Sequence, residues 1–159
     1  MLESHGGYTK DIHKGDIVIG TDAINITSVE PKGEGKNIED YEITTFLHNE
    51  ENKLIFRKAD KKLVEFIKEK FEGDNLHFGI IGSGDIFNKN PEVIKHLNEK
   101  YGAICEDMEC VSIYQVAEIF KIPVVSIKGI SNNEVLREKY DYTVSNKLQK
   151  FVWNIIEAI

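Results

Sequence analysis

Three short polar segments of the sequence carry the residue types that could perform chemistry. Residues 82–88 (GSGDIFN) place small residues before an acid and an aromatic ring, and residues 105–109 (CEDME) hold three carboxylates within four positions. Residues 131–134 (SNNE) combine a hydroxyl, two amides and a carboxylate. Each segment follows an apolar, β-prone run, so each is expected at the end of a strand. If the three ends converge in one crevice, they predict a ligand site.

Each of these segments also has an ordinary structural explanation. Acids at a strand-to-helix junction are favoured by the positive end of the helix dipole. Ser131 or Asn132 could cap a following helix, and Phe87 could be a core aromatic. No single segment is specific, because the sequence contains no P-loop, no GxGxxG and no HExxH motif. Residues 82–84 lack the spacing of a nucleophile elbow, which argues against a serine hydrolase.

The two cysteines, Cys105 and Cys110, are not accompanied by a nearby histidine, so a zinc site is not expected. We expect buried free thiols, which suit a reducing cytoplasm. These residue types predict neither a bound metal ion nor a cofactor.

Composition argues against two classes of partner. The net charge is -7 and the lysines are scattered among acids, whereas a nucleic-acid surface needs clustered Lys and Arg. No segment approaches the roughly 20 apolar residues that a membrane span requires. Residues 1–10 are polar and do not resemble the core of a signal peptide. We therefore expect a cytoplasmic protein with a small-molecule ligand, without nucleic acid or membrane partners.

Helical periodicity and apolar runs predict the elements that must position these residues. The predicted helices span residues 59–71, 91–101, 108–120 and 144–159. The predicted strands span residues 15–20, continued by the β-prone residues 22–29, and residues 76–81, 103–105 and 123–130, with short strands at 41–47 and 53–56. Residues 3–8 and 30–40 are predicted loops. The alternation predicts an α/β fold of one domain over residues 1–159, with a central mixed, largely parallel sheet flanked by helices.

Four segments, in order along nearly the whole chain, resemble the superfamily of purine nucleoside phosphorylases and methylthioadenosine/S-adenosylhomocysteine nucleosidases. Residues 4–7 (SHGG) and 14–18 (KGDIV) are similar to its "SAGG … GDIV" segment, and residues 82–87 (GSGDIF) to its "SGDxF" loop. Residues 106–114 (EDMECVSIY) resemble the "(E)ME(A)" stretch that opens a helix. Residues 122–132 (IPVVSIKGISN) resemble the strand that ends in "ISD". The resemblance implies the three-layer fold of that superfamily.

On the sugar side, the resemblance implies that Glu109 accepts hydrogen bonds from the ribose 2′- and 3′-hydroxyls and that Met108 packs against the sugar. Asp107 stands where the family often has a glutamate. Ser4 and Gly6 match the loop near the attacking water or phosphate. Cleavage of an N-glycosidic bond develops positive charge on the ribose, so a carboxylate beneath the sugar favours the transition state.

On the base side, the resemblance implies that Phe87 stacks on the purine and that the backbone near Phe87 and Asn88 reads the base edge. Asn132, after Ser131, replaces the family aspartate that protonates or hydrogen-bonds to N7. Asparagine cannot act as a general acid, but it can hydrogen-bond to N7 and to a 6-oxo or 6-amino group. It fits 6-oxopurines such as inosine or futalosine better than adenine, although a slow or inactive adenine enzyme is equally consistent. Asp85 or Glu134 could supply the proton.

The resemblance also implies that about a third of the family's chain, at its N-terminus, has no counterpart before Ser4. In the family that portion holds the first strands of the sheet, the water-activating glutamate of nucleosidases and the phosphate contacts of phosphorylases. We therefore expect the C-terminal two-thirds of the family fold, a homo-oligomer, and weak or no catalysis by this chain alone.

The function that the resemblance implies first is hydrolysis of the N-glycosidic bond of a purine nucleoside, of the methylthioadenosine/S-adenosylhomocysteine type. One alternative is a futalosine-type 6-oxopurine nucleosidase or a purine nucleoside phosphorylase, which would need phosphate as a co-substrate. The only arginines, Arg57 and Arg137, lie in no matched anion motif, which ranks the phosphorylase lower. The other alternative is a catalytically inactive remnant that binds nucleosides.

Overall fold

The protein is described by a computed structural model that covers residues 4–27, 29–31, 37–38, 41–43 and 56–159. The described residues form four helices: α1 (Lys61–Lys70), α2 (Pro91–Tyr101), α3 (Cys110–Phe120) and α4 (Val144–Ala158). The larger sheet contains β1 (Ser4–Gly7), β2 (Ile17–Asn25), β5 (Phe56–Lys58), β6 (Leu76–Ser83), β7 (Ala103–Asp107) and β8 (Ser126–Asn133). A small second sheet pairs β3 (Val29–Pro31) with β4 (Tyr41–Ile43).

The larger sheet is mixed, and its strands follow the order β5-β2-β6-β7-β1-β8. The pairs β2–β6, β6–β7 and β1–β8 are parallel, whereas β1–β7, β2–β5 and β2–β8 are antiparallel. Because β8 pairs with both β1 and β2, the sheet curls back on itself. The prediction of an α/β fold with a mixed sheet flanked by helices is confirmed.

The helices begin and end at residues whose chemistry favours termini. Asp60 accepts a hydrogen bond from the backbone N–H of Leu63 and so caps α1, and Asn90 caps α2 in the same way before Pro91. Gly102 ends α2 with a left-handed backbone, φ 74°. These signals are local, and all four helices lie within two residues of their predicted bounds.

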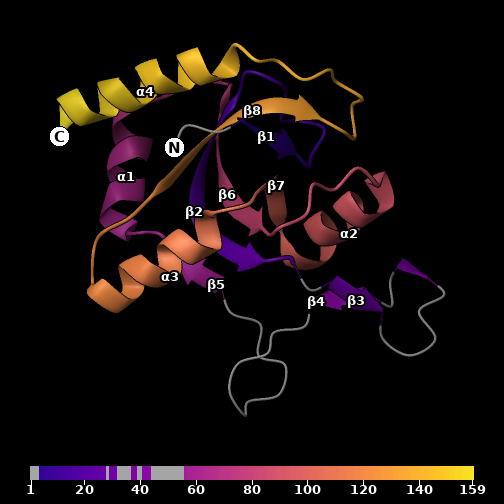
Figure 1. The fold of residues 1–159 in the computed structure, drawn as a ribbon. Coiled ribbons are helices and arrows are strands. Elements are labelled where there is room, and N and C mark those ends of the chain that lie inside the picture. Colours follow the sequence, from indigo (N-terminus) through magenta and orange to yellow (C-terminus); the bar gives the residue numbers. More distant parts are fainter. Residues whose placement is uncertain (1–3, 28, 32–36, 39–40, 44–55) are drawn as a thin grey trace.

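Helices cover both faces of the strands (Figure 1). One apolar cluster joins α1 and α4 to β2, and includes an edge-to-face contact between Phe71 and Phe151 with ring centroids 5.3 Å apart. A second packs α2 against the far side of the sheet, and a third packs Tyr114 of α3 against β2 and β6. The strands are therefore held from two sides, which fixes the positions of their ends.

Two sequence predictions need correction. Residues 3–8 were expected to form a loop, but Ser4–Gly7 form β1, because this segment pairs with β7 on one side and β8 on the other. The strand expected at 123–130 runs instead from Ser126 to Asn133, because its polar end pairs with β1. Residues 44–55, which contain most of two expected short strands, lie outside the described residues.

None of the helices in the described part of the chain combines the length and apolar character needed to cross a bilayer. The two thiols are confirmed as free and buried, Cys105 in β7 and Cys110 at the start of α3. Among the described residues, no three His, Cys, Asp or Glu side chains come together as metal ligands would.

Two adjacent isoleucines of α4 test the packing of this helix against the sheet. Ile155 is 5% exposed and lies in the core, whereas Ile156 is 57% exposed. We expect Ile155→Ala to lower the free energy of unfolding by about 2–5 kcal/mol, because it removes buried methyl groups and leaves a cavity. Ile156→Ala should change it by less than about 0.5 kcal/mol. Denaturant unfolding of both variants measures the difference, and equal losses would show that α4 does not pack as described.

Candidate active site

A row of residues crosses four neighbouring strands at the centre of the candidate site. Glu106 of β7 pairs with Gly82 of β6 and Gly6 of β1, and Gly6 pairs in turn with Asn132 of β8. Residues directly opposite one another on paired strands project to the same face. Gly6 has no side chain, so the backbone between Glu106 and Asn132, called the strip below, carries none. The Glu106 side chain lies against the strip, since a Cβ built on Gly6 would be 3.3 Å from Oε1. The backbones of Glu106 and Asn132 are separated by two strand spacings, about 10 Å.

The carboxyl group of Glu106 is buried in a cluster with Tyr8 and Asn88. The Tyr8 hydroxyl donates to Oε2 at 2.6 Å, and the Asn88 side-chain amide donates to the same oxygen at 2.8 Å. The backbone N–H of Asn88 lies 3.2 Å from both carboxyl oxygens. Glu106 therefore connects three chain segments: the residue after β1, the end of β7 and the loop after β6 that carries Phe87.

Burial raises the pKa of Glu106 above the ordinary glutamate value, and the nearby carboxylate of Glu134 adds to this effect. The hydrogen bonds from Tyr8 and Asn88 act in the opposite direction, because they stabilise the charged form. Burial, together with the Glu106 carboxylate, also raises the pKa of the Tyr8 hydroxyl. Tyr8 is thus a donor in this cluster rather than an ion.

Asp107, the next residue of β7, points away into the protein rather than towards Gly6. Its carboxylate lies 2.5 Å from the Nζ of Lys128 and accepts a hydrogen bond from the backbone N–H of Cys110. Both charged side chains are buried. The alternative role for the acids, at the positive end of a helix, does not apply to Glu106, which belongs to β7. It fits Asp107, whose carboxylate accepts the N–H of Cys110, the first residue of α3. Asp107 also fixes the junction that presents Met108 and Glu109.

Met108 and Glu109 lie between β7 and α3, at the solvent boundary. Met108 is 47% exposed, and Glu109 is half-buried at the N-cap position of α3. The junction is also tied to the end of β6, since Ser83 Oγ accepts from the Val111 N–H at 3.2 Å and the Gly84 N–H donates to the Asp107 carbonyl. Met108 and Glu109, which the resemblance assigns to the sugar, thus lie two and three residues after Glu106.

Asn132 is buried in β8, and hydrogen bonds fix the orientation of its amide. Its Oδ1 accepts from Ser131 Oγ at 3.0 Å, and its Nδ2 donates to Glu134 Oε1 at 2.9 Å. The alternative capping role belongs to the next residue: Asn133 Oδ1 accepts from the backbone N–H groups of Val135 and Leu136. Asn132 is therefore an oriented polar group at the edge of the strip rather than a cap.

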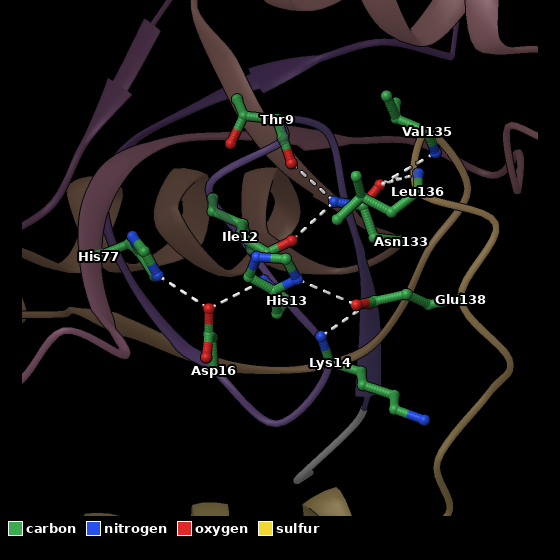
Figure 2. Close-up of polar contacts among 10 residues, drawn as sticks. All are labelled: Thr9, Ile12, His13, Lys14, Asp16, His77, Asn133, Val135, Leu136 and Glu138. Carbon is green, nitrogen blue, oxygen red and sulfur yellow. Dashed lines mark hydrogen bonds and ion pairs between the residues drawn. The ribbon is translucent and has the colours of Figure 1, made fainter.

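Asn133 joins the segment after β1 to the segment after β8 (Figure 2). Its side-chain amide donates to the carbonyl groups of Thr9 and Ile12, each at 2.7 Å. The same loops are linked at the surface, where His13 Nδ1 lies 3.1 Å from a Glu138 carboxyl oxygen. The segment after β1 is consequently held to the end of β8 and to the loop that follows it.

Phe87 and Ser4 are two further residues that the sequence places in the site. Phe87 is 38% exposed in the loop after β6, so it is not an ordinary core aromatic. Ser4 pairs through its backbone with Gly129, and the structure does not describe its side chain. Two hollows, of about 230 and 290 Å³, border α3 on the side of Tyr114 and Val124, away from Gly6. Neither hollow is lined by Gly6, Glu106 or Asn132.

The sequence alone did not identify Tyr8, Glu106, Lys128 or Asn133 as parts of this arrangement. Glu106 lay within a segment singled out for its acids, but its partners are 18 and 98 positions away. Lysine within the β-prone run of β8 was a usable signal, because a cation in a buried strand requires a counter-charge.

The buried pair of Asp107 and Lys128 can be tested by removing the cation. Lys128→Met should lower the free energy of unfolding by about 3–5 kcal/mol, because it leaves the Asp107 carboxylate buried without a counter-charge. Adding Asp107→Asn should recover part of this loss, since an amide still accepts the Cys110 N–H. Chemical denaturation measures both variants, and a loss under about 1 kcal/mol for Lys128→Met would contradict a buried ion pair.

The raised pKa of Glu106 predicts how stability depends on pH. Above the ordinary glutamate pKa of about 4.3, the unfolded chain releases this proton before the folded chain does. The contribution of Glu106 to stability is therefore present below that value and is lost as pH rises through the raised folded value. Relative to the wild type, Glu106→Gln should gain stability as pH rises above the ordinary glutamate value, as measured by denaturation at several pH values. A pH-independent difference would show that the carboxyl group titrates normally.

Known proteins that are similar to this chain belong to the superfamily that its sequence resembles. The family model of the phosphorylase superfamily matches residues 4–157. The 5′-methylthioadenosine/S-adenosylhomocysteine nucleosidase of Buchnera aphidicola is 38% identical over 110 residues, 64% of this chain and 47% of that protein. The enzyme of that name from Bacillus velezensis is 25% identical over 98% of this chain and 67% of its own length.

Solved structures share the fold. A futalosine hydrolase mutant of Helicobacter pylori superposes with a TM-score of 0.70 at 22% identity, covering 98% of this chain and 66% of that one. The 5′-methylthioadenosine/S-adenosylhomocysteine nucleosidase of S. pneumoniae, solved with a transition-state inhibitor, gives a TM-score of 0.74 at 20% identity, covering 99% and 67%. The chain thus spans about half of the first curated relatives and two-thirds of these structures. Since the family model covers almost every residue, the chain belongs to the phosphorylase superfamily.

Proposed function

We propose that this chain forms the nucleoside-binding part of a purine nucleosidase of the methylthioadenosine/S-adenosylhomocysteine type, which hydrolyses the N-glycosidic bond. The observation that carries the proposal is the strip over Gly6, flanked by Glu106 and Asn132 on one face of the sheet. Phe87 and Glu109 follow the ends of the two adjoining strands, β6 and β7. A base between Glu106 and Asn132 would place its sugar towards the start of α3.

In the proposed reaction, Glu109 binds the ribose hydroxyls and stabilises the positive charge that develops on the sugar. Asn132 donates a hydrogen bond to N7 of the leaving base. One N–H of its amide is directed to Glu134, and the other has no acceptor among the described residues. Because an amide cannot release a proton at ordinary pH, the proton must come from elsewhere. Glu134, 2.9 Å from the Asn132 amide, is the acid best placed to supply it.

The similarity to methylthioadenosine/S-adenosylhomocysteine nucleosidases and to a futalosine hydrolase supports a nucleosidase. The reaction would use water and no cofactor, in the cytoplasm, and the protein would be a homo-oligomer. Exposed apolar side chains on α3 support the last point, since a patch of this kind commonly marks an interface. They are Ile113, Val116, Ile119 and Phe120.

A phosphorylase is the weaker alternative within the same family. Arg57 forms an ion pair with Glu118 of α3 at 2.7 Å, remote from the strip, and Arg137 is exposed in a turn with φ 55°. Among the described residues, neither arginine forms a hydrogen bond or ion pair with Gly6, Glu106 or Asn132. A nucleoside-binding protein without turnover is the remaining alternative, because the chain spans only part of its relatives.

The proposal is tested by incubating the protein with methylthioadenosine, adenosylhomocysteine, inosine and futalosine, without phosphate, and measuring free base. We expect base release from at least one nucleoside, and Glu109→Gln should lower kcat by about 10²- to 10³-fold, because it removes the carboxylate beneath the sugar. Glu69→Gln, on the exposed face of α1, is the matched control and should be neutral.

The controls separate the alternatives. Base release that requires phosphate would replace the nucleosidase with a phosphorylase. Binding of nucleosides in a calorimeter without any release would favour the binding protein, and the absence of both binding and release would refute the proposal.

A further inference from the structure

The Glu106 side chain covers the strip at Gly6, which is where the proposed function places the base. A Cβ built on Gly6 would have its three nearest contacts with Glu106, namely Oε1 at 3.3 Å, Cγ at 3.7 Å and Cδ at 3.9 Å. The carboxyl group therefore lies against the backbone on which a base would rest. A base and this side chain cannot occupy that place together, because both would need van der Waals contact with Gly6.

Three donors from two chain segments converge on this carboxyl group. The Tyr8 hydroxyl and the Asn88 side-chain amide donate to Oε2 at 2.6 and 2.8 Å, and the Asn88 backbone N–H lies 3.2 Å from both oxygens. A purine carries nitrogen and oxygen acceptors on its edges, which suit donors of this kind. Glu106 thus occupies, at these donors, the position that the edge of a ligand would take.

The ionised form of Glu106 is buried here without a counter-charge. Among the described residues, Glu106 forms no ion pair with a lysine, arginine or histidine. The titratable groups around it are Tyr8 after β1, Cys105 on β7 and Glu134 after β8. Burial raises the pKa of Glu106, and the carboxylate of Glu134 adds to the rise. An ionised carboxyl group held only by neutral donors regains solvation when it leaves such a place.

From this arrangement we propose that Glu106 is an autoinhibitory side chain, which occupies the base position on the strip and must rotate away before a base can bind. This inference rests on the proposed function, because that function places the base on the strip. It assigns Glu106 no contact with the bound base, and it does not depend on which purine is bound. Removal of the side chain, which would weaken a site that uses it, strengthens binding here.

The bias towards the closed state sets the size of the effect. A base binds only the open fraction of the molecules, so the apparent affinity is lowered by that fraction. Opening breaks the hydrogen bonds that Glu106 accepts from Tyr8 and Asn88, and the regained solvation of the carboxylate offsets part of this loss. Bonds of this number and kind correspond to a bias of about 10- to 100-fold.

Calorimetric titration of the whole chain with adenine and with hypoxanthine tests the proposal. We expect Glu106→Ala to bind both bases about 10- to 100-fold more tightly than the wild type, because no side chain has to leave the strip. Glu92→Ala, on the exposed first turn of α2, is the matched control and should keep the wild-type affinities. Chemical denaturation shows whether each variant is folded.

Titration of the wild type with hypoxanthine at several pH values gives a test that needs no variant. In the closed state burial raises the pKa of Glu106, whereas a carboxyl group in water keeps the ordinary value of about 4.3. Opening therefore releases a proton, and it becomes easier as pH rises from the ordinary value to the raised one. We expect the affinity to rise over that interval, by up to about tenfold per pH unit. An affinity that stays constant or falls would contradict the proposal, even if Glu106→Ala did not fold.

The contrary outcomes separate this inference from the proposed function. A folded Glu106→Ala that binds both bases no more tightly than the wild type would overturn the autoinhibition and leave a purine nucleosidase intact. Weaker binding by this variant would also overturn it, because Glu106 would then support the bound base or the loop that carries Phe87. If neither the wild type nor Glu106→Ala binds either base, the inference and the proposed function are both refuted.

Discussion

The arrangement of the site depends on the insertion of a four-residue strand, β1, between β7 and β8. Its glycines make this possible: a Cβ on Gly7 would come within 3.0 Å of the Asn133 amide and the Ile12 side chain, and one on Gly6 would crowd Glu106. Glycine weakens a strand, because it has no side chain to pack and loses more backbone entropy. The polar side chains that lean over β1 offset this loss with hydrogen bonds to the segments on either side.

Those polar side chains are buried and extensively bonded. Glu106 receives hydrogen bonds from two residues, Asp107 is paired with Lys128, and Asn133 makes four bonds to backbone groups. In a medium of low dielectric constant, such networks are strong when they are complete and costly when one member is lost. They add rigidity where three chain segments meet, which is where a nucleoside would need fixed contacts. The apolar clusters of the core supply stability, and the polar groups fix the positions of the side chains at the candidate site.

The parts of the fold that could be predicted from the sequence are those with local signals. The helices were predicted because periodicity, Asp60, Pro91 and Gly102 all lie within the segments they define. β1 was not predicted, because SHGG has little strand propensity and becomes a strand only by pairing with residues about 100 to 130 positions away. The Glu106 cluster was missed for the same reason: the resemblance drew attention to Glu109, and nothing local joins Glu106 to Tyr8.

The base and the sugar of the proposed substrate would contact parts of the fold that are held in place in different ways. The base would lie on strands whose positions are fixed by the pairing of β7, β1 and β8 and by the Asn133 bonds. The sugar would lie at Met108 and Glu109, where α3 begins and its outer face exposes Ile113 and Phe120 to solvent. Covering that apolar face would stabilise α3, and with it the position of Glu109. Base recognition therefore follows from the strands described here, whereas the sugar contacts depend also on what packs against α3.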